Sequence, residues 1–205
     1  MDIQAVIFDF GRVISDFDIG KFIERAAHSS SLSAAGLKET MAQSMQTAER
    51  YETGLMTSRE FYANVCRIAS LTMPEEEFAR AYTDIFTPKP ATLELVKRLK
   101  GRYRLGLLSN TSEWHFEFGI KPVEIFPLFD AVTLSFEVHA MKPDRRIYDD
   151  MLAKLGLPAG ACVYIDDIAG NVAAGIALGL HGIQYTTHER LINDLANAGV
   201  DVSPH

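Results

Sequence analysis

Five short apolar runs, separated by longer amphipathic segments, constrain the fold of this chain more than any other feature of its sequence. The runs occupy residues 3–10, 103–110, 131–136, 162–167 and 181–187, and each is apolar almost throughout. A strand without polar alternation is typical of a sheet that helices cover on both faces. All five runs are far too short to cross a bilayer, so we expect no membrane-spanning segment.

The segments between the later runs have a helical pattern. Residues 90–101, 145–157 and 169–180 each carry apolar side chains at the spacing of one helix face. Regular alternation of strand and helix predicts an α/β fold built on a doubly wound, parallel, Rossmann-like sheet.

Residues 16–87 interrupt this alternation and have mainly helical patterns. We expect helices near residues 18–29, 33–49, 57–71 and 74–86, and a linker at residues 87–90. The chain should therefore form a catalytic core of residues 1–15 and 88–205, into which a small helical cap of residues 16–87 is inserted. We call residues 16–87 the insert. Because 47% of the 205 residues are apolar, a sizeable core can be buried.

Charge and cysteine content narrow the range of partners. A net charge of −7 argues against nucleic acid or an anionic membrane as the main partner. The first residues lack the basic stretch and cleavage site of a secretory signal, and Cys66 and Cys162 lie in separate apolar segments. We expect a cytoplasmic protein with reduced cysteines, either a monomer or a homodimer.

Polar residues that can carry chemistry fall at the ends of the predicted strands. Asp9 closes the first, Ser109 and Asn110 close the second, and Asp166 and Asp167 close the fourth. In open α/β sheets, ligands bind beyond the carboxyl ends of the strands. We therefore expect these side chains to share one site, together with a lysine that follows the third strand.

These residue types suit a phosphate group and a metal ion. A carboxylate such as Asp9 can attack phosphorus as a covalent nucleophile, provided that a cation screens the repulsion between the two anions. Asp9 and Asp167 offer hard oxygen ligands for Mg²⁺, and the backbone carbonyl of Gly11 could complete the shell. Lys142 adds a compact positive charge. The short polar side chains that close the second strand offer hydrogen-bond donors to phosphoryl oxygens.

Four segments occur in a fixed order along the chain, each at the end of a predicted strand. They are FDFGRV (8–13), LLSNT (107–111), MKP (141–143) and IDDIAGN (165–171). Together they resemble the haloacid dehalogenase-like hydrolase superfamily, and the insert falls where the subfamily with an early helical cap places it. The resemblance implies Mg²⁺-dependent hydrolysis of a small-molecule phosphate ester, such as a sugar phosphate, through an aspartyl-phosphate.

The resemblance also implies roles for individual residues. Asp9 is then the nucleophile, and Lys142 steadies the charge on the transferred group. The two residues that close the second strand contact the phosphoryl group. Asp167 is the acidic metal ligand, and Asp166 is either a second ligand or a carboxylate that supports the first.

The sequence departs from the family pattern at Gly11. Most phosphatases of the superfamily have an aspartate there, which serves as general acid and base, so esters with readily departing leaving groups are expected to be favoured. Glu52, in the segment YETG (51–54) between two expected helices, is the first candidate for a substitute acid near the substrate, and His115 is the second. The segment equally fits a plain helix–helix turn, and His115 fits a structural or surface histidine better than a proton donor.

Two other functions fit the same residues. One is hydrolytic release of halide from a 2-haloacid, which uses an aspartate nucleophile and needs neither the acid nor a metal. The other is a phosphate-ligand-binding or regulatory protein that has lost turnover through Gly11. Asp166, Asp167 and Lys142 favour phosphate over halide. In the plainest interpretation, however, the two aspartates only cap the next helix and Lys142 is a solvated lysine.

Overall fold

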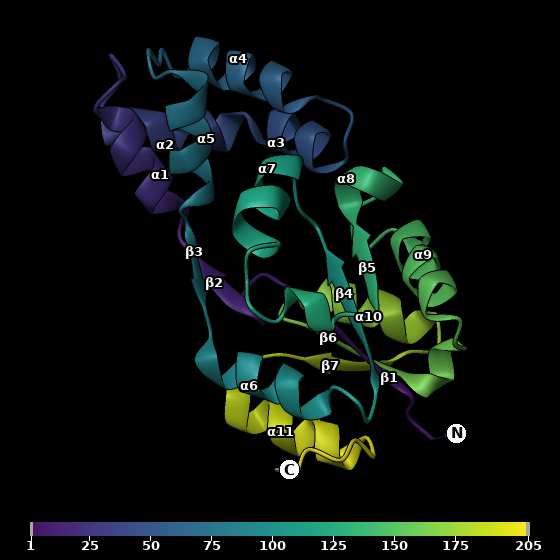
Figure 1. Cartoon of the computed structure of the whole chain (residues 1–205). Helices are drawn as coiled ribbons and strands as arrows, with labels where there is room; N and C mark the ends of the chain where they lie inside the picture. Colours follow the sequence, from purple (N-terminus) through teal and green to yellow (C-terminus); the bar gives the residue numbers. More distant parts are fainter. Residues whose placement is uncertain (1, 204–205) are drawn as a thin grey trace.

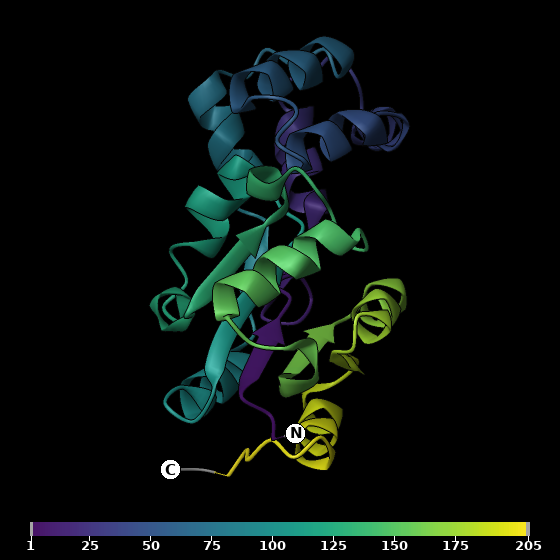
Figure 2. The same cartoon turned by 90° about the vertical axis from the view of Figure 1, so that its right-hand side faces the viewer.

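A five-stranded parallel sheet forms the centre of the molecule. The computed structural model describes residues 2–203, and the strands lie in the order β5-β4-β1-β6-β7. Their bounds are β1 Ala5–Phe8, β4 Arg104–Ser109, β5 Ala131–Leu134, β6 Cys162–Asp166 and β7 His181–Gln184. Every pair of neighbours is parallel. The α/β fold expected from the apolar runs is confirmed (Figures 1 and 2).

Helices cover both faces of the sheet, because successive strand residues point to opposite sides. The flanking helices are α6 Pro90–Leu99, α9 Arg145–Leu155, α10 Ala169–Ala177 and α11 His188–Asn197. Val6 and Phe8 of β1 lie in one apolar cluster with α6 and α11, whereas Ala5 and Ile7 lie in another with α9 and α10. This is the doubly wound arrangement that the sequence predicts.

The insert forms a helical layer over the carboxyl end of the sheet, at the top of the view in Figure 1. Its helices are α1 Ile19–Ala27, α2 Ala34–Gln43, α3 Met45–Glu52, α4 Ser58–Ile68 and α5 Glu75–Thr83. Their buried side chains form an apolar cluster of their own, which is rich in aromatic rings. Within it Tyr51 stacks on Phe61 with the ring centroids 4.3 Å apart. The division of the chain into core and cap at residues 15/16 and 87/88 stays a prediction.

Two connections join the insert to the sheet, and they pair with each other. Strands β2 (Ser15–Phe17) and β3 (Phe86–Pro88) form an antiparallel two-stranded ribbon. The expected helix over 74–86 and linker over 87–90 were therefore wrong at this point. The outgoing and returning chains lie side by side here, so their backbone groups can satisfy one another.

The helix expected over residues 33–49 is in fact two helices, α2 and α3, which meet at Ser44. This residue leaves the helical conformation (φ −102°, ψ 22°), and its hydroxyl donates to the Thr40 carbonyl oxygen at 2.8 Å. A serine side chain bonded to the preceding turn competes with the backbone hydrogen bonds of a helix. Helix α3 runs on to Glu52, so Tyr51 and Glu52 lie in its last turn and not in a loop.

The remaining elements are short and lie at the rim of the sheet. They are α7 Glu113–His115, a π-helix Phe116–Ile120, α8 Ser135–Val138, and 3-10 turns at Phe126–Leu128 and Ala159–Ala161. The strand expected over 131–136 therefore ends early, because α8 begins at Ser135. The Ser135 hydroxyl lies 2.6 Å from the Glu52 carbonyl oxygen, which ties α3 to the end of β5. Among residues 2–203, no helix is both long and apolar enough to cross a membrane.

Gly54 allows a test of how closely the insert packs on the rest of the chain. It has φ +66°, and a Cβ there would lie 2.1 Å from the Phe136 carbonyl oxygen. Gly101 also has a positive φ, +88°, but a Cβ there would meet nothing within 4 Å. We expect Gly101→Ala to lower the free energy of unfolding by about 1–2 kcal/mol, the cost of a left-handed backbone, and Gly54→Ala to lower it by clearly more. Denaturant unfolding measures both, and equal losses would contradict the steric contact.

Candidate active site

The predicted site residues meet at the carboxyl edge of the sheet. Asp9 follows β1, Ser109 ends β4 and Asp166 ends β6, and these three strands are neighbours in the sheet. Asp167 comes next along the chain, and Lys142 reaches the same place from the segment after α8. The topology thus brings together residues from four separate parts of the sequence.

Lys142 is the electrostatic centre of this site. Its side chain is only 2% exposed, and Nζ lies 2.7 Å from Asp9 Oδ1 and 2.7 Å from Asp166 Oδ2. The ammonium also donates to the Leu108 carbonyl oxygen at 3.1 Å. Three acceptors match the three N–H bonds of an ammonium. The interpretation of Lys142 as a solvated lysine is therefore wrong.

Asn110 holds the backbone of Lys142 in place. Its Oδ1 accepts from the Lys142 backbone N–H at 2.7 Å, and its Nδ2 donates to the Lys142 carbonyl oxygen at 3.1 Å. Both ends of this amide are engaged, so a phosphate contact from the same side chain would compete with them. By contrast, the buried Ser109 hydroxyl makes only a 3.5 Å approach to the Asn110 carbonyl oxygen. The predicted phosphate contacts of both residues stay predictions.

Asp166 is engaged by protein donors on both of its oxygens. Oδ1 accepts from the Ile168 backbone N–H at 2.8 Å and from Asn171 Nδ2 at 3.1 Å. Oδ2 accepts from Lys142 and from the Tyr164 hydroxyl. The side chain is fully buried. This arrangement positions the lysine, and it favours the supporting role over the role of a second metal ligand.

Sequence reasoning missed the hydroxyl of Tyr164, which belongs to an apolar strand. Burial raises the pKa of this hydroxyl strongly, so it stays protonated and can donate to Asp166. Residues 164 and 166 are two apart in β6 and therefore point to the same face of the sheet. A tyrosine two positions before a strand-ending acid was the signal available in the sequence.

The carboxylates of the site can hold a hard cation. One oxygen from each of Asp9, Asp166 and Asp167 lies within 4.8 Å of the others. Asp9 and Asp167 line a polar cavity of about 330 Å³ together with Gly11 and Lys142, whereas Asp166 does not line it. An all-oxygen donor set of this kind fits Mg²⁺, with Asp9 and Asp167 as the carboxylates that line the cavity, and the Gly11 carbonyl stays a predicted ligand.

The charges of the site are unbalanced. Burial raises the pKa of Asp9 to about 6, although the neighbouring Lys142 acts against this rise. Burial and then the charge of Asp166 raise the pKa of Asp167. Burial alone would lower the pKa of Lys142, but Asp9 and Asp166 outweigh it, so this pKa is raised. The three acids face the Lys142 ammonium and the more exposed Arg12 guanidinium, whose Nε lies 3.8 Å from Asp167 Oδ2, and a bound cation would favour their ionised forms.

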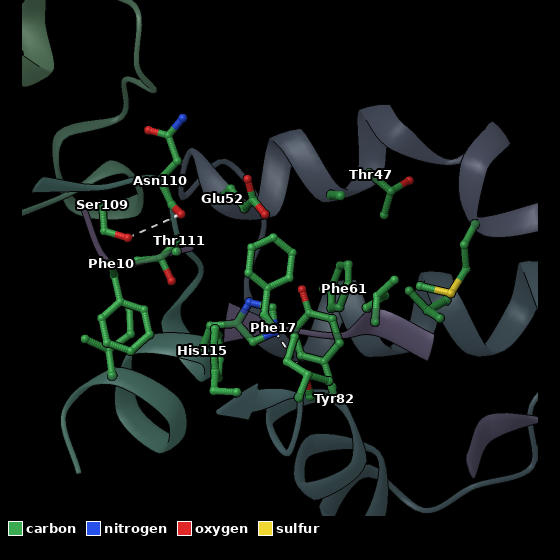
Figure 3. Close-up of a pocket in the computed structure, with 18 of the residues that line it drawn as sticks. Phe10, Phe17, Thr47, Glu52, Phe61, Tyr82, Ser109, Asn110, Thr111 and His115 are labelled. Atoms are coloured by element: carbon green, nitrogen blue, oxygen red, sulfur yellow. Dashed lines mark hydrogen bonds between the residues drawn. The ribbon is translucent and has the colours of Figure 1, made fainter. Parts of the chain in front are cut away.

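A second, largely apolar cavity of about 340 Å³ adjoins the polar one (Figure 3). Gly11, Phe17, Glu52 and Asn110 line both cavities. In Figure 3 Ser109 and Asn110 lie at one end and the rings supplied by the insert lie at the other. A group bound at the polar site therefore has space towards the insert for whatever is attached to it. A third cavity, of about 980 Å³, also shares Glu52, Met141 and Lys142 with the polar one.

Glu52 lies at the junction of the two cavities. Its half-buried side chain projects from the last turn of α3, and burial, followed by the charge of Glu49, raises its pKa to about 7. A carboxyl group with this pKa is partly protonated near neutral pH and can both give and take a proton. The prediction that Glu52 acts near the substrate is untested, and its position and pKa support it.

His115 has the opposite properties. Its Nε2 lies 3.1 Å from the Tyr82 carbonyl oxygen, and its ring stacks on the Tyr82 ring with centroids 4.1 Å apart. A carbonyl oxygen can only accept, so Nε2 carries the hydrogen. Burial lowers the pKa of the ring to about 4, which leaves Nδ1 without a proton at neutral pH. These contacts and the lowered pKa favour a structural role for His115 over a role as proton donor.

Comparison with known proteins agrees with the geometry. A family model described as haloacid dehalogenase-like hydrolase matches residues 3–179. The chain is 26% identical over 191 residues to the D-ribitol-5-phosphate phosphatase of Bacteroides thetaiotaomicron. The alignment covers 89% of this chain and 91% of the relative. It is 25% identical over 195 residues to the sesquiterpene phosphatase of Aspergillus oryzae. This alignment covers 89% of the chain and 90% of the relative.

A solved structure has the same fold. It is the crystal structure of a HAD family enzyme from Bacteroides thetaiotaomicron in complex with magnesium and inorganic phosphate. The two superpose with a TM-score of 0.79 at 21% identity, over 90% of this chain and 94% of the other. At this identity the likeness concerns the fold.

The raised pKa of Glu52 makes stability depend on pH in a definite direction. In the folded chain the Glu52 carboxyl group has a pKa of about 7, whereas the ordinary pKa of a glutamate is 4.5. The protonated Glu52 side chain therefore stabilises the fold fully at a pH below its pKa in the unfolded chain. This stabilisation is lost as the pH rises through its pKa in the folded chain. Glu52→Gln lacks the carboxylate, so its Tm relative to the wild type should rise by a few degrees between about pH 5 and pH 8, at about 2–4 °C per kcal/mol.

Thermal unfolding at a series of pH values checks this expectation. Glu39→Gln is the matched control, because Glu39 lies exposed on α2 and its Tm difference from the wild type should stay constant. A constant difference for Glu52→Gln as well would show that the Glu52 pKa is ordinary.

Proposed function

Because the chain belongs to the haloacid dehalogenase-like hydrolase family, we propose that it is a phosphatase that hydrolyses a small-molecule phosphate ester through an aspartyl-phosphate on Asp9, with Mg²⁺. The observation that carries this proposal is the Lys142 ammonium, buried against Asp9 and Asp166 with Asp167 beside them. The phosphatase relatives and the magnesium and phosphate complex of the fold neighbour support it.

The proposed reaction has two steps on Asp9. Its carboxylate attacks phosphorus, the bond from phosphorus to the ester oxygen breaks, and the alcohol leaves with a proton. Water then attacks the phosphorus of the acyl phosphate, which releases inorganic phosphate and restores the carboxylate. Lys142 faces the charge that develops on the transferred group. Mg²⁺, held by Asp9, Asp167 and the Gly11 carbonyl, supplies the positive charge that lets two anions approach.

We propose that Glu52 donates a proton to the leaving oxygen. Gly11 stands where most phosphatases of the family have an acid, and it has no side chain that could do this. Glu52 lies where the polar and apolar cavities meet, which is where the oxygen of the leaving group has to be. Once it has given its proton to the leaving oxygen, its carboxylate can take one from the attacking water. This assignment competes with the expectation, drawn from Gly11, that esters with readily departing leaving groups are favoured.

The alternative functions have less support from the site. Release of halide needs no metal, yet Asp9 and Asp167 line the polar cavity with carboxylate oxygens beside a buried lysine. A non-catalytic phosphate-binding protein remains the competitor that the following experiment separates. A small phosphorylated molecule as the partner, a cytoplasmic location, and a monomeric or homodimeric state are carried forward as parts of the proposal.

Hydrolysis should require both the nucleophile and the cation. Phosphate release from aryl and alkyl phosphates is measured with Mg²⁺, with EDTA, and in Asp9→Asn. We expect EDTA to abolish turnover, because the acids then repel the phosphate. We expect Asp9→Asn to lower turnover by more than about a thousandfold, since an amide is a poor nucleophile.

Asp149→Asn is the matched control, because Asp149 is exposed on α9 and lines neither cavity. Labelling with a phosphate ester and denaturing quench should trap phosphate on Asp9 of the wild type and of Asp149→Asn, and leave Asp9→Asn unlabelled. Full turnover in EDTA would rule out the cation site. Binding of phosphate without any covalent label would identify a non-catalytic binding protein.

The role of Glu52 predicts how the rate depends on the leaving group. With a proton donor in place, phosphoenzyme formation should depend weakly on leaving-group pKa across a series of aryl phosphates. In Glu52→Gln the dependence should become steep, with the poorest leaving groups slowed by about 10²–10⁴-fold. Single-turnover kinetics measures both slopes. His115→Ala is the comparison, and a slope that steepens there but not in Glu52→Gln would transfer the role to His115.

A further inference from the structure

The apolar cavity beside the phosphate site is built mainly from aromatic rings. Phe10 contributes from the edge of the sheet, Phe17 and Phe86 from the β2–β3 ribbon, and Phe61 and Tyr82 from the helices of the insert. Figure 3 shows the rings of Phe10, Phe17, Phe61 and Tyr82 around the same space. A volume of about 340 Å³ lies within the usual range of small-molecule pockets, about 300–1,000 Å³.

Several of the polar atoms that line this cavity are engaged within the protein. Ser44 donates to the Thr40 carbonyl oxygen, and the Asn110 amide is clamped on the backbone of Lys142. The His115 Nε2 faces the Tyr82 carbonyl oxygen. Among the described residues that line the cavity there is no lysine or arginine, and Glu52 supplies the one carboxyl group.

A polyol fits such a cavity poorly. Each hydroxyl group of a sugar or alditol loses water on binding and needs a partner in the pocket, and unpaired hydroxyls weaken binding. The Thr47 and Thr111 hydroxyls and Glu52 offer a few partners, but aromatic and aliphatic side chains make up most of the lining. A hydrocarbon chain or ring would gain affinity with every carbon that it buries.

We infer that the alcohol part of the substrate is apolar, so that the chain hydrolyses phosphate monoesters of hydrocarbon-like alcohols rather than of sugars. The inference rests on the proposed function for the identity of the phosphate site. The phosphate lies at Asp9 and Lys142, its ester oxygen lies beside Glu52, and the hydrocarbon part lies among the rings of the insert. This deepens the proposed function, because it selects one of the two substrate types suggested by the phosphatase relatives.

Binding of n-alkylphosphonates tests the inference without any turnover. Calorimetric titration of the full chain in Mg²⁺, from methylphosphonate to octylphosphonate, should show Kd falling by about fourfold per methylene. In Ala48→Phe the gain per methylene should be much smaller, because Ala48 lines the cavity and the added ring fills it. Ala42→Phe adds the same ring at an exposed position of α2, so its slope should equal that of the wild type.

A matched pair of substrates gives the second arm. Pentyl phosphate and D-ribitol 5-phosphate share a five-carbon chain and a primary alkyl leaving group, and they differ in their hydroxyls. We expect kcat/KM to favour pentyl phosphate by at least tenfold. A Kd independent of chain length, or a preference for the ribitol ester, would overturn the inference and leave the phosphatase standing. Chain-length-dependent binding with no hydrolysis of any ester would keep the apolar ligand and overturn the phosphatase.

Discussion

The ion cluster of Lys142 with Asp9 and Asp166 is the interaction on which the rest of the site depends. An ammonium buried to this extent is stable only when it is paired and fully hydrogen-bonded. Its partners come from the ends of β1 and β6, and the lysine itself comes from the segment after α8. The contacts that close the edge of the sheet are thus the same contacts that fix Asp9, the proposed nucleophile. Asn110 and Tyr164 extend this network by holding the lysine backbone and the second carboxylate.

Above this polar edge the insert supplies a different environment. Its helices pack around aromatic rings, and some of those rings face the cavity in place of water. Glu52 is the point at which the two environments meet, and its backbone carbonyl is tied to Ser135. The nucleophile and the proposed proton donor therefore sit on separate parts of the chain. A change in how α3 packs would move Glu52 while leaving Asp9 in place, so the insert can control both the chemistry and the choice of leaving group.

Much of the fold followed from local patterns, and the errors have identifiable causes. Apolar runs located all five strands of the main sheet, because a strand that helices cover on both faces is apolar almost throughout and can be recognised from that pattern. The break at Ser44 was missed, since one serine side chain bonded to the preceding turn outweighs an otherwise helical pattern. Strand β3 was missed because three residues form a strand only beside the partner that the tertiary structure provides.

The sequence by itself determined which residues stand at the strand ends, and hence that Asp9, Ser109, Asp166 and Asp167 share one edge of a parallel sheet. It did not determine how each of them is used. Both oxygens of Asp166 accept hydrogen bonds from protein donors, while its neighbour Asp167 lines the cavity. Two adjacent aspartates in a sequence give no sign of this difference. Likewise, the sequence ranked Glu52 before His115 as a proton donor, but only the structure shows that burial raises the pKa of one and lowers that of the other. The reason is that burial and hydrogen-bond partners are set by residues far away along the chain, and only the folded structure brings those residues together.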